Sequence, residues 1–188
     1  MKDLYDNGCT IFTPSYPNPE FAARQTLFAS GSTAGQSFQQ GAVDDAGKGD
    51  EWGFIPYPGP DGTLVVNSLG QMVGIVRTNP EQDMASWLFL RYLTSPETQT
   101  TWISYTGYFP SQITTDVAER EASDPVWATG YGLLDLGKAE PNLAAHGAAR
   151  SAIRDAFFDI LEAEDLDAII AILEELNTLL AELVAELQ

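Results

Sequence analysis

The residue types that most often perform chemistry in proteins are scarce in this sequence. His146 is the only histidine, and no set of metal-ligand residues stands at a diagnostic spacing around it. Cys9 is the only cysteine, so neither an intrachain disulfide nor a multi-cysteine zinc site can form. We expect His146 to be a surface or capping residue and Cys9 to be a buried structural thiol. The sequence therefore predicts no metal site, no cofactor and no catalytic nucleophile.

The small-residue run ASGSTAG, residues 29–35, has some features of a phosphate-binding loop. It lacks both the lysine of a P-loop and the glycine spacing of a dinucleotide-binding turn, so we expect no nucleotide there. Serines and glycines of this kind do allow a sharp turn that opens a short helix, and the first backbone N–H groups of such a helix are free to donate hydrogen bonds. The run therefore indicates a hydrogen-bond donor site.

The 27 acidic residues leave glycoside hydrolysis open, because that chemistry needs two carboxyl groups across one cleft. Nothing in the sequence identifies two of them as such a pair. The same acids outnumber 9 basic residues and give a formal charge of -18, which disfavours nucleic acid and anionic membranes as partners. An acidic surface is also typical of a protein that is simply soluble.

Aromatic residues form the most informative group. A flat apolar ring with a polar handle can stack on a carbohydrate and hydrogen-bond to it, although the same rings also pack well in a core. Trp87 stands on an apolar helical stripe, so we expect it in the core. Tyr108 and Phe109 stand in the short loop YTGYFPSQ, residues 105–112, where both interpretations remain open. Most of the group is placed at segment ends or in loops: Trp52, Tyr57, Trp87, Trp102, Tyr105, Tyr108, Phe109, Trp127 and Tyr131.

The first half of the chain mixes short helices with strands. Residues 18–28 read as a short helix, and a second helix should follow the small-residue run. Residues 51–62 predict an extended strand beside turns, because they carry three prolines and three glycines. Residues 63–76 predict a strand, a tight break at Gly70 and a second buried strand, since β-branched residues flank the glycines.

Helices dominate the second half. Two consecutive helices should begin at Pro80 and Pro96, with Ser95 as the N-cap of the second and Gly107 at its end. Residues 111–137 predict a helix, an Asp-Pro break and another helix, and residues 146–161 predict a strongly amphipathic helix. At 188 residues, 44% of them hydrophobic, the chain can form one domain or two small lobes. It has no uninterrupted apolar run of about 18 residues, and its start lacks the pattern of an export signal.

The tail over residues 165–188 predicts a last amphipathic helix. Its apolar positions follow a four-three spacing with Asn177 in the seam, at 166, 170, 173, 177, 180, 184 and 187. A helix docked on its own domain gives this pattern, and so does a short coiled coil that joins two chains. We favour the docked helix and keep the dimerisation helix as an alternative.

In their order along the chain, several of these segments resemble one known family. The resemblance is to the C-terminal portion of extracellular solute-binding proteins of ABC importers, in the group that carries sugars and glycerol 3-phosphate. It is carried by FAARQTLFASGSTAG, EWGFIPYPG, the glycine-broken strands around Gly70, NPEQDMASWLFLRYLTSPETQTTW, TGYFP, and EPN followed by AARSAIRDAFFDIL. It covers nearly the whole chain, and Arg24 departs from it, standing where the family commonly has glycine.

The resemblance implies an α/β, periplasmic-binding-protein-like fold of type II, with two lobes that close over a solute. It places only the helix-rich C-terminal half of that fold in this chain. Residues 1–62 would belong to the second lobe, residues 63–110 would supply crossover strands and helices of the first lobe, and residues 111–188 would return to the second. Full members are about twice as long and begin with an export signal and a first half, so the resemblance also implies a truncated chain.

The same resemblance assigns ligand-binding residues. The serine of the small-residue turn corresponds to Ser30 or Ser32, and Ser32 is preferred because it follows the glycine directly. Gly70 would let the backbone approach the solute, and Tyr108 corresponds to the tyrosine of the family's TGY(F/L)P loop. Arg150 corresponds to the arginine that opens the penultimate helix, where its forked donors would grip a phosphate or sugar hydroxyls. Arg154, one turn later, is as good a surface partner for Asp155 or Asp159.

The sequence therefore predicts a solute-binding component of an ABC importer that is not an enzyme. Its partners would be a sugar or glycerol phosphate and the transmembrane permease subunits, with no nucleic acid. Its location would be periplasmic or extracellular, tethered to the membrane in the full-length protein. The alternatives are a helical interaction protein that dimerises through residues 165–188, and a glycoside hydrolase.

Overall fold

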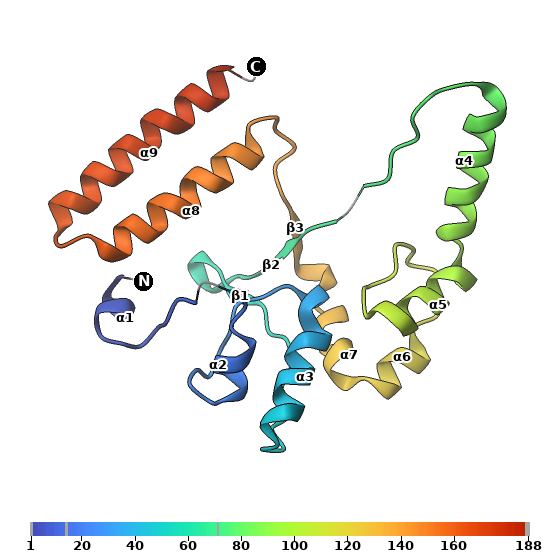
Figure 1. Ribbon diagram of the computed structural model, residues 1–188, viewed down its shortest axis with the longest axis horizontal. Coiled ribbons are helices and arrows are strands. Elements are labelled where there is room, and N and C mark those ends of the chain that lie inside the picture. The colour runs from blue at the N-terminus through green and yellow to red at the C-terminus, as the bar shows by residue number, and fades with distance from the viewer. Residues whose placement is uncertain (1, 14, 71, 187–188) are drawn as a thin grey trace. The chain divides into compact units, whose positions relative to one another are not determined.

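The computed structural model describes residues 2–13, 15–70 and 72–186. The chain forms two compact units, of which the first combines Met1–Pro14 with Glu140–Gln188 and the second spans Ser15–Ala139. Helices make up most of the described chain, and the one sheet that it contains has three short strands (Figure 1). No helix of the described residues combines the length and the apolar character needed to cross a membrane.

The second unit begins with short helices and the sheet. Helix α2 (Asn18–Ala22) contacts α3 (Gln36–Ala46), which follows the 3₁₀ turn η1 (Thr33–Gly35). Strand β2 (Leu64–Ser68) is central: it pairs antiparallel with β1 (Tyr57–Pro58) and parallel with β3 (Gly137–Ala139). The 3₁₀ turns η2 (Pro60–Gly62) and η3 (Leu134–Leu136) precede β2 and β3. The parallel pairing brings residues about 70 positions apart in the sequence into one ladder.

Four helices complete the second unit between β2 and β3. They are α4 (Pro80–Leu93), α5 (Pro96–Thr106), α6 (Ala118–Ser123) and α7 (Pro125–Tyr131). The expected N-cap of α5 is confirmed, since the Ser95 hydroxyl accepts a hydrogen bond from the Thr98 N–H at 3.4 Å. Its end at Gly107 is also confirmed, because Gly107 takes the left-handed conformation with φ 72° that glycine adopts without strain.

The first unit pairs α8 (His146–Glu162) with α9 (Leu166–Glu186), and α1 (Lys2–Asp6) contacts α8. The Lys2 ammonium donates to the carbonyl of Leu161 at 3.0 Å, and Phe12 lies edge-on to Phe157 and Phe158. The contact of α9 with α8 agrees with a helix that docks within its own unit. Leu187, the last position of the predicted seam, lies outside the described residues.

Each unit has its own small core. In the second unit the Trp127 side chain is 0% exposed, and its indole N–H donates to the Gly107 carbonyl at 2.9 Å. The Trp127 ring stacks on Tyr131 at 4.9 Å between centroids, and Phe109 meets it edge-on at 5.2 Å. In the first unit the buried apolar residues are Ala145, Ala156 and Leu161. The aromatic cluster ties the loop after α5 to α7.

Several predicted elements are shorter in the structure. The helix expected over residues 18–28 ends at Ala22, because Arg24 takes a left-handed conformation with φ 63° that no α-helix continues. The strand expected in residues 51–62 is reduced to the two paired residues of β1, followed by η2, and most of the helix expected after residue 111 is loop before α6. Propensity alone does not set these boundaries, since each depends on one backbone conformation or one pairing partner.

The second strand predicted in residues 63–76 is wrong. β2 ends at Ser68, and residues 72–79 have no regular secondary structure, while Gln71 lies outside the described residues. The expectation that Trp87 is in the core is also wrong, since its side chain is 53% exposed. Both differences have one physical cause. Among the described residues, no strand pairs with residues 72–76, and none extends the sheet over α4.

Candidate functional site

A polar cavity of about 650 Å³ lies in the second unit, between the start of α3, the end of α5 and the α6–α7 corner. We call it the polar cup. Half of the residues around it carry hydroxyl or amide groups, and Tyr105 adds an exposed aromatic ring. Its lining is Thr33, Ala34, Gln36, Ser37, Gln40, Gly41, Asp44, Ser104, Tyr105, Thr106, Gly107, Arg120, Ser123, Asp124, Pro125 and Val126. A concave surface with convergent polar groups is the usual form of a small-molecule site.

The small-residue turn forms one wall of the polar cup. The Ser32 hydroxyl caps η1 by accepting from the Ala34 N–H at 3.2 Å, and α3 continues directly from that turn. The Ser30 hydroxyl is hydrogen-bonded to the Tyr57 hydroxyl. Thr33 and Ala34 line the cup, so Ser32 stands at its border. The turn predicted from ASGSTAG is therefore present and opens a helix, as expected.

The end of α5 forms a second wall of the polar cup. The two aromatic residues that follow it, Tyr108 and Phe109, have different surroundings. Gly107 takes the left-handed conformation at the helix end, and Phe109 packs edge-on against both Trp127 and Tyr131. Tyr108, one residue earlier, remains 50% exposed next to Gly107, which lines the cup. Of the two interpretations left open, Phe109 thus follows the packing one, and Tyr108 has a ring that is free to meet a solute.

Asp124 joins the walls of the polar cup through four hydrogen bonds. Its carboxylate accepts twice from the Gln36 amide at 2.9 Å, once from Arg120 at 2.7 Å and once from the Trp127 N–H at 2.9 Å. The last contact makes Asp124 the N-cap of α7. Arg120 also lies 5.8 Å from the Trp127 ring centroid. One side chain therefore positions α3, α6 and α7 around the cavity.

The charges of the polar cup leave a mild acidic excess. Arg120 and Asp124 neutralise one another, whereas the Asp44 carboxylate on α3 accepts from the Gln40 amide at 2.8 Å and has no cationic partner in the part of the chain that the structure describes. The Nε of Arg120 is buried and has no hydrogen-bond partner. The hydroxyl and amide groups of the lining can both donate to and accept from a solute. The cup can thus hold a hydroxyl-rich molecule through donors and acceptors on several sides.

None of the five predicted site residues lines the polar cup, although Ser32 and Tyr108 each adjoin a lining residue in the sequence. Gly70 is exposed in the segment after β2, with open space where a side chain would be. Arg150 is on α8 in the other unit and donates to the Glu140 carboxylate at 2.9 Å. Arg154 donates to Asp155, which was one of its two expected partners. The residues next to Ser32 and Tyr108 therefore line one cavity of the second unit, whereas Arg150 forms an ion pair with Glu140 in the first unit.

Neither the single histidine nor the single cysteine of the chain lines the polar cup. His146 begins α8, and its Nε2 lies 3.1 Å from a Glu140 carboxylate oxygen. Cys9 is exposed, so the expectation of a buried thiol is wrong. Its N–H donates to the Leu4 carbonyl at 2.7 Å in the turn after α1, and this turn leaves its side chain in solvent. The described residues contain no group of three or more metal-ligating side chains.

Gln36, Arg120 and Asp124 are cavity residues that sequence reasoning missed, whereas Tyr105 belongs to the aromatic group that it named. One signal was available for Asp124, because an aspartate directly before Pro125 is typical of a helix N-cap. Gln36 and Gln40 are also one helical turn apart, which places both amides on the same face of α3. The meeting of α3 with α6 and α7 is a tertiary feature that no local pattern encodes.

Comparison with known proteins decides the family. The family model described as bacterial extracellular solute-binding protein matches residues 1–130. The chain belongs to this family. The polar cup of this solute-binding protein lies entirely within the matched region, since its last lining residue is Val126. No curated protein matches the chain at a significant level.

Membership in this family supports the general predictions from the sequence, namely the fold, the kind of ligand, the partner and the location. It implies a periplasmic-binding-protein-like fold, of which this chain shows a helix-rich structure with a small three-stranded sheet. It also implies a small-molecule ligand, an ABC transporter as partner and a location outside the cytoplasmic membrane. Members of such a family are generally receptors rather than enzymes.

Proposed function

We propose that this solute-binding protein captures a sugar or a glycerol-3-phosphate-like solute and delivers it to the permease of an ABC importer. The observation that carries the proposal is the polar cup, where hydroxyl and amide groups converge from three elements beside the exposed Tyr105 ring. Sugar hydroxyls need donors and acceptors together, and an aromatic face can stack on the ring. The family match supports the receptor role.

In this proposal the solute lies in a cleft between two lobes, with Ser30, Ser32, Gly70, Tyr108 and Arg150 as its contacts. Residues 1–62 and 111–188 belong to the second lobe and residues 63–110 to the first. The chain is similar to the C-terminal portion of the two-lobe fold of type II, and the full-length protein is tethered to the membrane. Lobe closure over the solute is the change that the permease detects.

A ligand screen tests the proposed solute class. We expect mono- and oligosaccharides or glycerol 3-phosphate to raise the melting temperature, because a ligand that binds only the folded chain stabilises it by mass action. Titration calorimetry then gives the dissociation constant. A screen in which none of these compounds shifts the melting temperature at millimolar concentration would contradict the proposal.

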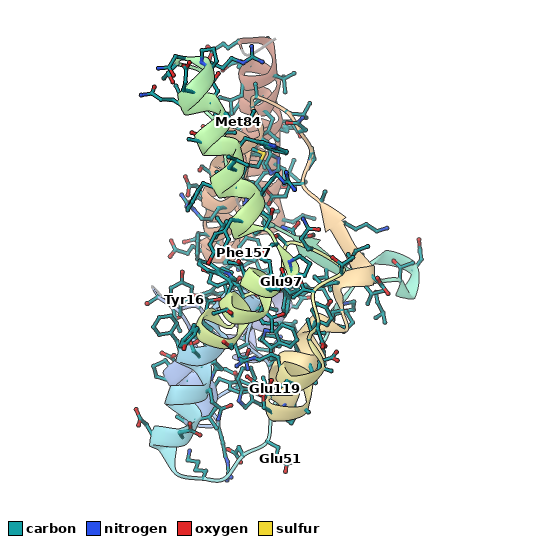
Figure 2. All side chains as sticks on the ribbon, turned by 90° about the vertical axis from the view of Figure 1, so that its right-hand side faces the viewer. Tyr16, Glu51, Met84, Glu97, Glu119 and Phe157 are labelled. Carbon is teal, nitrogen blue, oxygen red and sulfur yellow. The ribbon has the colours of Figure 1, made fainter. Side chains whose placement is uncertain are left out.

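Tyr108 allows a residue-level test of the same proposal. Tyr108→Ala should weaken binding of the best carbohydrate by about 1–2 kcal/mol, since it removes a ring that can stack on the sugar. Tyr16→Ala is the matched control, because Tyr16 is another exposed tyrosine of the second unit, labelled in Figure 2. Equal losses in both variants would remove Tyr108 from the site.

Arg150 is tested with an anionic solute. Arg150→Ala should weaken glycerol 3-phosphate by about 2 kcal/mol or more if the guanidinium holds the phosphate. Arg154→Ala serves as the control on the same helix, because Arg154 is paired with Asp155. An unchanged dissociation constant for Arg150→Ala would leave this residue as the ion-pair partner of Glu140 only.

A further inference from the structure

The charged side chains that line the polar cup do not balance. Among the described residues of the lining, the charged ones are Asp44, Arg120 and Asp124. The Arg120 guanidinium donates to the Asp124 carboxylate at 2.7 Å, so these two charges cancel. Asp44 has no ion-pair partner within the ranges that the structure describes. The remaining negative charge favours a cation in the cup and disfavours an anion.

Two consecutive hydrogen bonds hold the Asp44 carboxylate on the wall that α3 provides. The Trp52 indole N–H donates to the Gln40 amide oxygen at 2.9 Å. Because this bond fixes the orientation of the amide, the Gln40 NH₂ group faces Asp44 and donates to it at 2.8 Å. A carboxylate can accept several hydrogen bonds, so this one leaves room for others. Asp44 is also exposed, so a solute can reach it.

The features of the polar cup that could bind a phosphate are already engaged. The Arg120 guanidinium is paired with Asp124. At the turn that opens α3, the N–H groups of Ala34 and Gly35 donate to the hydroxyl and carbonyl oxygens of Ser32. A helix start binds an anion through N–H groups that have no other acceptor, so these two do not provide an anion site.

Tyr105 provides a surface that suits a cationic sugar. It lines the cup from α5, and its side chain is 86% exposed. The face of a tyrosine ring attracts a cation and can also stack on a sugar ring. Ser37, Ser104 and Thr106 line the same cavity, and their hydroxyl oxygens can accept from sugar hydroxyls. The cup therefore offers contacts both for an ammonium group and for a hydroxyl-rich body.

The uncompensated charge, the engaged donors and the exposed ring favour one class of solute. We propose, on the basis of the solute capture proposed above, that the polar cup selects a hydroxyl-rich solute that carries an ammonium group, such as an amino sugar. The Asp44 carboxylate binds the ammonium group, and the hydroxyl and amide groups of the lining bind the sugar hydroxyls. A phosphate ester is disfavoured, because its charge has the same sign as that of Asp44.

Titration calorimetry with the full chain tests this charge preference. D-Glucosamine is compared with N-acetyl-D-glucosamine, D-glucose and glucose 6-phosphate at about pH 6, where an amine is protonated and a carboxylate is ionised. We expect glucosamine to bind at least about threefold more tightly than the neutral sugars, and glucose 6-phosphate to bind most weakly. Equal affinities for glucosamine and the neutral sugars would overturn the charge preference and leave sugar capture intact. No binding of any of these compounds would overturn both.

n-Butylamine separates recognition of a sugar from simple attraction of a cation. It carries an ammonium group but no hydroxyl groups, so it should bind at least about tenfold more weakly than glucosamine. If n-butylamine binds as tightly as glucosamine, charge alone attracts the solute, and selection of an amino sugar is wrong.

Matched variants of α3 locate the ammonium site. Asp44→Asn keeps an acceptor for the Gln40 amide and removes the charge, so the affinity ratio of glucosamine to glucose should fall to about one. Asp45→Asn is the control, because Asp45 is the adjacent exposed aspartate of α3 and lies outside the cup lining. It removes the same charge from the whole molecule and should keep the ratio of the original chain. Equal ratios in the two variants would overturn the assignment of Asp44.

Salt gives an independent check on the charge. The preference for glucosamine over glucose should shrink when NaCl is raised from about 0.05 M to about 1 M, because the Debye length falls to about 3 Å and Asp44 is exposed. A preference that is the same at both salt concentrations would mean that shape distinguishes the two sugars, and the role of the Asp44 charge would then be wrong.

Discussion

At the scale of single residues, Arg24 combines a strained backbone with an ion pair. Arg24 has φ 63°, in the left-handed region where glycine is favoured. Its guanidinium donates to both oxygens of Asp50, at 2.9 and 2.6 Å. The left-handed backbone of Arg24 destabilises the fold, and its ion pair with Asp50 stabilises it. A glycine at this position would avoid the strain but could not form the ion pair.

Substitution of Arg24 should separate these two effects. Arg24→Gly relieves the strain but loses an exposed ion pair, so we expect its unfolding free energy to stay close to that of the original chain. Arg24→Ala keeps the strain and loses the pair, so it should be the less stable variant. Chemical denaturation of both variants checks the order. If Arg24→Ala were as stable as Arg24→Gly, the backbone at residue 24 would not be strained.

The same pair makes a prediction about pH. Hydrogen bonds from Arg24 lower the pKa of Asp50, and those hydrogen bonds raise the pKa of Arg24. A lowered carboxyl pKa contributes stability above the pKa of the unfolded state, and this contribution is lost as pH falls through the folded pKa. Asp50→Asn should therefore be less stable than the original chain at pH 7 and equally stable at about pH 2. A difference that stays constant between these pH values would contradict the ion pair.

Asp124 should be the most sensitive polar residue of the polar cup. Asp124→Ala removes the N-cap of α7 and leaves Gln36 and Arg120 without their acceptor, so we expect a loss of about 2 kcal/mol in stability. Asp124→Asn is the matched control. It keeps an oxygen for the Trp127 N–H and should lose about half as much. If the two variants are equally stable, Asp124 does not hold the cavity walls together.

At the scale of elements, α7 is held by close contact with two aromatic rings. A Cβ atom at Gly130 would lie 2.9 Å from the Phe54 ring and 3.2 Å from the Phe109 ring. Gly130→Ala should therefore cost about 1–3 kcal/mol in unfolding free energy, although alanine favours helices. Gly132→Ala is the control in the same turn, since its Cβ would stay at least 3.4 Å from other atoms. We expect this substitution to cost less than about 1 kcal/mol in unfolding free energy. Thermal or urea unfolding distinguishes the two.

The elements that sequence predicted well are those with local signals. Ser95 and Pro96 start α5, Gly107 ends it, and the Asp-Pro pair separates α6 from α7, because caps and breaks act on neighbouring residues. The second strand after Gly70 failed for the opposite reason. A strand needs a partner from elsewhere, and propensity says nothing about whether the described chain supplies one. Sequence singled out Ser32 and Tyr108, which adjoin lining residues of the polar cup, but not the Asp124 contacts that join its walls.

At the scale of the whole molecule, each of the two units contains its own buried residues. Leu161 is buried in the first unit and Ile103 in the second. We therefore predict that the chain unfolds in two calorimetric transitions rather than one, which breaks the two-state approximation. Leu161→Ala should lower the midpoint of one transition, and Ile103→Ala should lower the midpoint of the other, because each substitution costs about 2–5 kcal/mol in its own core. Differential scanning calorimetry of the two variants measures both midpoints. If both variants shift a single shared transition, the units fold as one cooperative body, and a solute that binds the polar cup of the second unit would then stabilise the first unit as well.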